Sequence, residues 1–166
     1  MSAQSENGLL VPETLEAIET WLKKYPPEQK RSALIAALTA AQKQNGGWLS
    51  RDLMDAVADH LGLPRVWAYE VAHFYSMLDT RPTGRHKVSI CNNISCMLRG
   101  ADALIEHVER KLGIRRGETT PDGRITLVLE EECLAACCGA PMMVVDGHYH
   151  ENLTPEKVDE VLDGLE

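Results

Sequence analysis

The chain of 166 residues is 44% hydrophobic and 25% charged, which is the composition of a globular protein and excludes the disordered and fibrous classes. Its formal net charge is -8 at pH 7, and residues 86–166 hold 15 acidic against 8 basic side chains, whereas residues 1–85 hold 10 and 9. This balance argues against nucleic acid, which is bound by neutralising phosphates with Lys and Arg, and favours a basic protein surface as the partner.

The first half of the sequence has the periodicity of α-helices. Apolar residues recur at helical spacing in four segments delimited by prolines, glycines and a capping residue, Ser50. The predicted helices cover residues 12–25, 34–45, 51–61 and 65–78. They predict a compact bundle with Trp48, Trp67 and Phe74 in its core, because large aromatic residues at such spacing are usually buried.

A change of periodicity marks a domain boundary. Residues 81–85 carry Pro, Gly and charge, as a linker does. We therefore predict an N-terminal helical region, residues 1–84, followed by a second domain, residues 85–166.

The second half alternates strands with helices, so the fold class is α/β (α+β). The predicted order is a strand at 88–90, a helix from about 97 to 112, a strand at 125–129, a hairpin at 142–150 and a helix from 155. The second strand places Ile125, Leu127 and Leu129 on one side. Asp146-Gly147 is a two-residue hairpin signal, and Thr154 is a helix cap.

A strand-helix-strand unit makes its two strands parallel, so their carboxyl ends lie at the same edge of the sheet. Cys91 ends the first of these strands, and Cys133 follows the second. Two cysteine pairs that are far apart in sequence are therefore expected to meet at one edge.

The cysteines follow a pattern that suits a 2Fe-2S cluster. Cys91 and Cys96 are separated by four residues, and Cys133 and Cys137 by three. Such a cluster needs two thiolates on each iron, and two short loops that supply two sulfurs apiece meet this need. The helix expected to begin beside Cys96 would also turn its N-terminal amides towards the anionic cluster.

The cellular compartment supports thiolate ligands. Residues 1–10 lack the basic and apolar segments of an export signal, and no apolar run reaches the ~18 residues of a membrane span. We expect a cytoplasmic protein, at most peripheral to a membrane. An odd cysteine count of 5 in a reducing compartment disfavours a disulfide framework.

Other interpretations of the cysteines stay open. Four thiolates also hold structural zinc, although zinc sites usually have closer Cys-x2-Cys spacing. A thiol exchanger would need a Cys-x2-Cys at a helix start, which is absent. Cys138 is adjacent to Cys137 and is expected to be a packed thiol, and the histidines receive no metal role.

The sequence has no nucleotide-binding or catalytic motif. It lacks a Gly-x-Gly-x-x-Gly, a phosphate loop and a nucleophile paired with a base. We therefore expect no hydride-transfer site on this chain, and we expect its role to be electron carriage.

Several motifs resemble one family, the small 2Fe-2S subunits of respiratory complex I, known as the E subunits of bacterial NADH-quinone oxidoreductases. The resemblance covers nearly the whole chain. It rests on Gln42-Lys43-Gln44 with Gly46-Gly47-Trp48, on Val71-Ala72-His73-Phe74-Tyr75, on the Cys91 to Cys96 segment with Arg99-Gly100, and on Glu132-Cys133-Leu134-Ala135-Ala136-Cys137 with Ala140-Pro141.

The resemblance implies a helical region followed by a thioredoxin-like 2Fe-2S ferredoxin domain, with Cys91, Cys96, Cys133 and Cys137 as cluster ligands. It implies a partner subunit that carries FMN and binds NADH, with further peripheral-arm subunits, on the cytoplasmic side of the inner membrane. The cluster would be a neighbour of that flavin off the main electron path. Pro141 resembles the cis-proline of thioredoxin-like folds, and Cys138 departs from the small residue common after the last ligand.

Three alternatives to a complex I component remain. The same module resembles subunits of NAD-reducing hydrogenases and NAD-linked formate dehydrogenases. A zinc-stapled structural adaptor would have no redox role. A freely diffusing ferredoxin would have little use for the helical first half.

Overall fold

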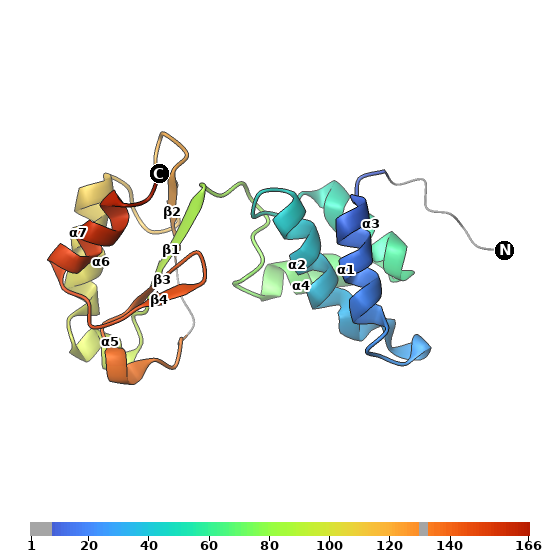
Figure 1. Ribbon diagram of the computed structural model, residues 1–166, viewed down its shortest axis with the longest axis horizontal. Helices are drawn as coiled ribbons and strands as arrows, with labels where there is room; N and C mark the ends of the chain where they lie inside the picture. Colours follow the sequence, from blue (N-terminus) through green and yellow to red (C-terminus); the bar gives the residue numbers. More distant parts are fainter. Residues whose placement is uncertain (1–7, 130–132) are drawn as a thin grey trace. The chain divides into compact units, whose positions relative to one another are not determined.

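The computed structural model describes residues 8–129 and 133–166. The chain divides into two compact units, which we call the helical unit, ending at Pro82, and the sheet unit, beginning at Thr83 (Figure 1). The mixed helix and sheet composition confirms the predicted fold class.

The helical unit contains four α-helices and one 3-10 helix within the described residues. Their bounds are α1 Pro12–Leu22, η1 Pro27–Ala33, α2 Leu34–Gln44, α3 Arg51–Leu61 and α4 Arg65–Phe74. The Ser50 side chain accepts a hydrogen bond from the Leu53 N–H, which confirms the predicted cap, and Gly62 ends α3 with a positive φ of 67°. The helix η1 was not predicted, because its short 3-10 turns lack a clear apolar period.

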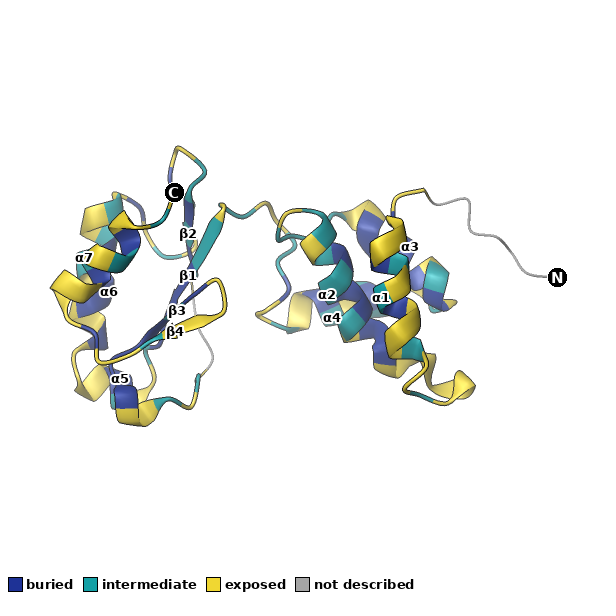
Figure 2. Cartoon of the chain, in the orientation of Figure 1, coloured by how far each residue is buried: buried dark blue, intermediate teal, exposed yellow. Residues whose placement is uncertain are grey.

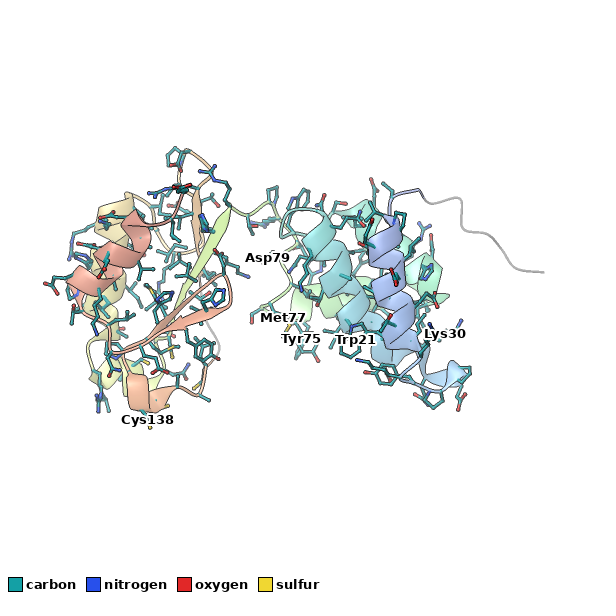
Figure 3. The ribbon with its side chains drawn as sticks, in the orientation of Figure 1. Trp21, Lys30, Tyr75, Met77, Asp79 and Cys138 are labelled. Carbon is teal, nitrogen blue, oxygen red and sulfur yellow. The ribbon has the colours of Figure 1, made fainter. Side chains whose placement is uncertain are left out.

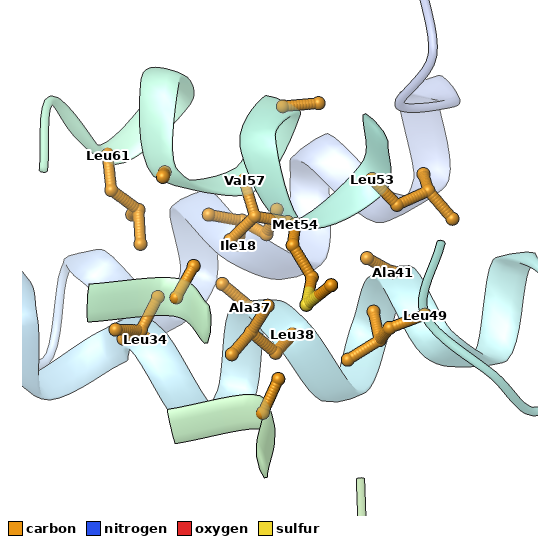
Figure 4. Close-up of a cluster of buried hydrophobic side chains, with 14 of the residues drawn as sticks. Ile18, Leu34, Ala37, Leu38, Ala41, Leu49, Leu53, Met54, Val57 and Leu61 are labelled. Atoms are coloured by element: carbon orange, nitrogen blue, oxygen red, sulfur yellow. The ribbon is translucent and has the colours of Figure 1, made fainter. Parts of the chain in front are cut away.

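The core of the helical unit is aliphatic. Its largest fully buried side chains come from α1, α2, α3 and the residue before Ser50, namely Ile18, Leu34, Leu38, Leu49, Val57 and Leu61 (Figure 4). Buried faces of the helices turn towards one another, and exposed faces point outwards (Figure 2). Helical spacing therefore located this core correctly.

The fourth helix is shorter than predicted, and one of its aromatic residues is not in the core. α4 ends at Phe74, because Tyr75 has an extended backbone with ψ 121°. Phe74 is 78% exposed, so its assignment to the core is wrong. Tyr75 and Leu78 pack on the core from the segment that follows the helix, while Trp67 is half-buried against it.

Two glutamines of α2 hydrogen-bond to irregular segments that lie outside the helices. The Gln42 Nε2 donates to the Met77 carbonyl at 3.0 Å, and its Oε1 accepts from the Asp79 N–H at 2.7 Å. Gln44 does the same for the other end of the unit, where it accepts from Val11 N at 3.0 Å and donates to Leu9 O at 2.6 Å. Each side-chain amide thus replaces a backbone partner for a segment outside regular structure.

Replacing Gln42 by methionine is expected to lower the free energy of unfolding of the helical unit by about 2 kcal/mol, because two hydrogen bonds are lost while the side-chain volume is kept. All 3 tryptophans lie in this unit, so their fluorescence in a urea titration reports its unfolding. The control is Lys43→Met on the exposed neighbouring position. Equal urea midpoints for the two variants would contradict the role of the Gln42 amide.

The sheet unit contains four strands in the order β2-β1-β3-β4. Their bounds are β1 His86–Ile90, β2 Ile125–Leu127, β3 Met143–Val145 and β4 His148–His150. β1 pairs in parallel with β2 and antiparallel with β3, which pairs antiparallel with β4. The parallel pair and the hairpin are confirmed. β2 is shorter than predicted, and Leu129 lies beyond it, 59% exposed.

Helices α6 and α7 cover this sheet, side by side on one of its faces (Figure 1). Their bounds are α6 Ala101–Leu112 and α7 Pro155–Asp163, and a short α5 spans Ile94–Leu98. The Thr154 side chain accepts from the Lys157 N–H at 3.4 Å and so caps α7, as predicted. Apolar residues of both helices pack on β1, β2 and β3 to form the core.

The single helix predicted from about Met97 to Leu112 is wrong, because it is two helices. Gly100 has a φ of 94°, a conformation that glycine adopts without strain and that breaks the helix between α5 and α6. Cys96 therefore lies within α5 and does not precede a long helix. The helix that was expected to begin beside Cys96 is therefore absent, and α5 begins at Ile94, before Cys96.

His86 joins the hairpin to the C-terminal residue. Its Nδ1 lies 2.7 Å from Asp146 Oδ2 and its Nε2 lies 2.9 Å from Glu166 O. Both neighbours are acceptors, so both ring nitrogens donate only when the imidazole is protonated. The hydrogen bond to Asp146 and then that to Glu166 raise the pKa of His86 above its ordinary 6.5, against smaller opposing effects of burial and then of Arg85.

This raised pKa predicts a pH dependence. The contribution of His86 to stability is complete below its unfolded pKa of 6.5 and is lost as the pH rises through the higher folded pKa. Relative to His86→Gln, the wild type should lose about 0.5 kcal/mol between about pH 5.5 and about pH 8.5, measured by far-UV circular dichroism in urea. His148→Gln, at an exposed histidine of β4, is the control. A pH-independent difference would contradict the prediction.

Candidate functional site

The two cysteine segments meet at one pocket of the sheet unit. The pocket has a volume of about 180 Å³. Its lining residues are Cys91, Asn93, Ile94, Ser95, Cys96, Cys133, Ala135, Ala136, Cys137 and Met142. All four cysteines predicted as ligands are therefore together, two from each segment, beyond the carboxyl ends of the parallel strands β1 and β2.

The first segment presents two buried thiols. Cys91 follows β1 directly and is 3% exposed, and its N–H donates to the Met142 carbonyl at 3.1 Å. Cys96 lies in α5 and is 2% exposed. Burial, together with a hydrogen bond to the Cys91 thiol, raises the pKa of the Cys96 thiol to about 11. These side chains are fixed by the strand and by the short helix.

The second segment, residues 133–141, which we call the second cysteine loop, is irregular. Cys133 and Cys137 are exposed at the mouth of the pocket. Ala135 has a φ of 56°, in the left-handed region that a non-glycine residue seldom adopts. The loop ends in the 3-10 helix η2, Cys137–Gly139, and in a cis peptide bond between Ala140 and Pro141, which confirms the hypothesis made for Pro141.

Cys138 is not the packed thiol that we expected. It is exposed and does not line the pocket, and its side chain projects from η2 at the surface of the sheet unit (Figure 3). Because consecutive residues of η2 point in different directions, Cys137 faces the pocket and Cys138 does not. The sequence could not distinguish exposure from packing here, since it does not reveal the 3-10 turn.

The donor set of the pocket fits a 2Fe-2S cluster. Four cysteine sulfurs from two segments would give each iron of such a cluster one pair. Among residues 8–129 and 133–166, no three His, Cys, Asp or Glu side chains form a group suited to a single ion. No histidine lines the pocket. Glu132, part of the motif that carries the family resemblance, lies outside the described residues.

Sequence reasoning missed several residues of the site. Met142 and residues 93–95 line the pocket, and Tyr149 touches the second cysteine loop from β4. Met142 follows the cis peptide, and residues 93–95 lead into α5. Their only signal in the sequence is proximity to the cysteines, and Tyr149 has none.

No helix in the part of the chain that the structure describes combines the length and apolar character needed to cross a membrane.

Comparisons with known proteins agree with this geometry. The E subunit of the NADH-quinone oxidoreductase of Rickettsia bellii strain RML369-C is 41% identical over 165 residues, which cover 99% of this chain and 98% of that protein. The E 2 subunit of the NADH-quinone oxidoreductase of Rhizobium meliloti strain 1021 is 47% identical over 150 residues, 90% of this chain and 87% of that protein.

Among solved structures, the air-oxidized NAD+-reducing [NiFe]-hydrogenase superposes with a TM-score of 0.65 over 76% of this chain and 22% of that chain. Their sequences are 21% identical, so this likeness concerns the fold alone. The model of the thioredoxin-like [2Fe-2S] ferredoxin family matches residues 18–166, nearly the whole sequence. The chain therefore belongs to the thioredoxin-like [2Fe-2S] ferredoxin family.

Proposed function

We propose that this chain is the electron-transferring E subunit of an NADH-quinone oxidoreductase and carries one 2Fe-2S cluster. The observation that carries the proposal is the pocket at which Cys91, Cys96, Cys133 and Cys137 converge. Membership of a 2Fe-2S family and full-length relatives that are named as E subunits of this oxidoreductase support it.

Each cysteine pair would hold one iron. Cys91 and Cys96 supply buried sulfurs from a strand end and from α5, and Cys133 and Cys137 supply sulfurs at the pocket mouth. The bound cluster supplies a site that accepts and releases one electron. The protein holds the sulfurs in place, and the buried pair keeps water away from its side of the pocket.

The chain would work only within a complex. No nucleotide-binding motif is present in the sequence, so FMN and NADH belong to a flavoprotein partner, which supplies hydride transfer. We further propose contacts with other peripheral-arm subunits and a place at the cytoplasmic side of the inner membrane. The acidic excess of residues 86–166 favours a basic partner surface.

We also propose that residues 1–84 and 85–166 are separate domains. The two compact units, which adjoin between Pro82 and Thr83, support this division. Each unit has its own apolar cluster. Expression of each half should give a folded protein, judged by circular dichroism.

A second candidate host complex is a NAD-reducing hydrogenase, because part of such an enzyme shares the fold of this chain. The higher identity to the E subunits of NADH-quinone oxidoreductases makes the quinone enzyme the better supported host. Affinity purification of the native complex and identification of its components distinguishes a quinone reductase from a hydrogenase.

The decisive experiment is iron, sulfide and zinc analysis of anaerobically purified full-length protein, with low-temperature EPR before and after dithionite reduction. The proposal expects about two irons and two sulfides per chain, no signal when oxidised and a spin-half signal when reduced. Stoichiometric zinc without sulfide, in protein made with ample iron, would replace the proposal by a structural zinc adaptor.

A further inference from the structure

The second cysteine loop is held from outside by the segment that begins in β4. Asn152 N donates to Gly139 O at 2.6 Å, and Leu153 N donates to Pro141 O at 3.0 Å. The two accepting residues, Gly139 and Pro141, both follow Cys137 in the sequence. The Tyr149 hydroxyl donates to Leu134 O at 3.3 Å, and Leu134 lies between Cys133 and Cys137. Tyr149 is therefore the side chain of this segment that contacts the loop between its two pocket cysteines.

The same loop has backbone donors without a protein acceptor. No hydrogen bond among the described residues uses the N–H of Ala135 or of Ala136, although both residues line the pocket. Ala135 has a φ of 56°, and Ala136 has a φ of -95°. When two neighbouring residues have φ angles of opposite sign, their successive N–H groups point to the same side of the backbone. Such concave backbone arrangements bind anions, including iron-sulfur clusters.

Tyr149 acts on one of these donors through a peptide plane. Leu134 O and Ala135 N belong to the same peptide unit, and in a trans unit the C=O and the N–H point in opposite directions. A hydroxyl that holds the Leu134 carbonyl from outside therefore turns the Ala135 N–H away from Tyr149, towards the pocket that Ala135 lines.

We propose that Tyr149 is a positioning residue that tunes the cluster: it fixes the Leu134–Ala135 peptide so that the Ala135 N–H donates a hydrogen bond to a cluster sulfur. This inference rests on the proposed function. A hydrogen bond to sulfur favours the reduced cluster, which carries one more negative charge, and therefore raises its reduction potential. Tyr149 is 54% exposed, so its removal leaves the core of the sheet unit intact.

The test compares Tyr149→Phe with wild type in the full-length protein, loaded anaerobically with iron and sulfide. Tyr149→Phe keeps the ring and removes only the hydroxyl. We expect the reduction equilibrium to shift about tenfold towards the oxidised form, which for one electron is a potential about 59 mV lower, in an EPR-monitored redox titration. The matched control is Tyr75→Phe, which removes a hydroxyl from the helical unit and should leave the potential unchanged.

Three outcomes decide the inference. A lowered potential in Tyr149→Phe, with the unfolding curve of the cluster-free protein unchanged, supports it. A potential equal to that of wild type overturns it, whether or not the cluster-free variant unfolds more easily. If the wild type itself assembles no 2Fe-2S cluster, the proposed function fails first, so the two failures are distinguishable.

Discussion

Cys91→Ser is expected to abolish stable cluster binding. Cys91 is 3% exposed directly after β1, its N–H donates to the Met142 carbonyl, and it is one of the four cysteines that line the pocket. A serine oxygen is a harder and far less acidic donor than a thiol, and iron-sulfur sites select soft sulfur ligands. The expected loss of affinity for the cluster exceeds the 10- to 100-fold loss that typically follows removal of a residue that only hydrogen-bonds to a ligand. Iron and sulfide content per chain, with the visible absorption of the purified variant, measures it.

Cys138→Ser is the matched control for this substitution. It makes the same chemical change one residue from Cys137, but Cys138 is exposed and lies outside the pocket. The variant should retain a full complement of iron and sulfide and the EPR signal of wild type. Equal cluster loss in the two variants would show that the ligand set is wrong.

Much of the sheet unit could be predicted because its signals are local. Asp146-Gly147 has the residue types that a two-residue turn requires, and the structure gives both a positive φ, 51° and 85°. Thr154 caps α7 through its own side chain. The parallel pairing of β1 and β2 followed from the strand-helix-strand order alone, and it brings Cys91 and Cys133 to one pocket.

The errors arise where tertiary contacts decide the outcome. The apolar period continues past Phe74, yet α4 ends there and Leu78 reaches the core from a turn, in which its N–H donates to the Tyr75 carbonyl. The apolar pattern predicted one continuous helix, but Gly100 interrupts it, because glycine adopts the αL conformation without steric strain. The contact of Tyr149 with Leu134 joins residues 15 positions apart in the chain, and no local pattern encodes it.

Gly139→Ala is expected to distort the second cysteine loop and to destabilise the sheet unit by about 3 kcal/mol, the upper end of the range for inserting a methyl group into a packed site. A Cβ at this position would lie 2.6 Å from Glu151 Cβ and closer still to the Glu151 carboxylate. The Glu151 side chain cannot relieve the contact by rotation, because its Cβ is fixed to the backbone. Gly139 O accepts from Asn152 N at 2.6 Å, which holds the two segments together.

Second-site variants identify this cause. Gly139→Ala combined with Glu151→Ala should stay destabilised, since alanine keeps the clashing Cβ, whereas Gly139→Ala combined with Glu151→Gly should recover most of the stability and the cluster content. Gly164→Ala is the control for adding a methyl group, because the atoms nearest to its added Cβ, the carbonyl oxygens of Glu160 and Val161, are 3.4 and 3.5 Å away. Far-UV circular dichroism in a urea titration measures the stability of all four proteins, and iron analysis measures their cluster content. If Glu151→Ala restored Gly139→Ala as well as Glu151→Gly does, the contact between the two Cβ positions would not be the cause.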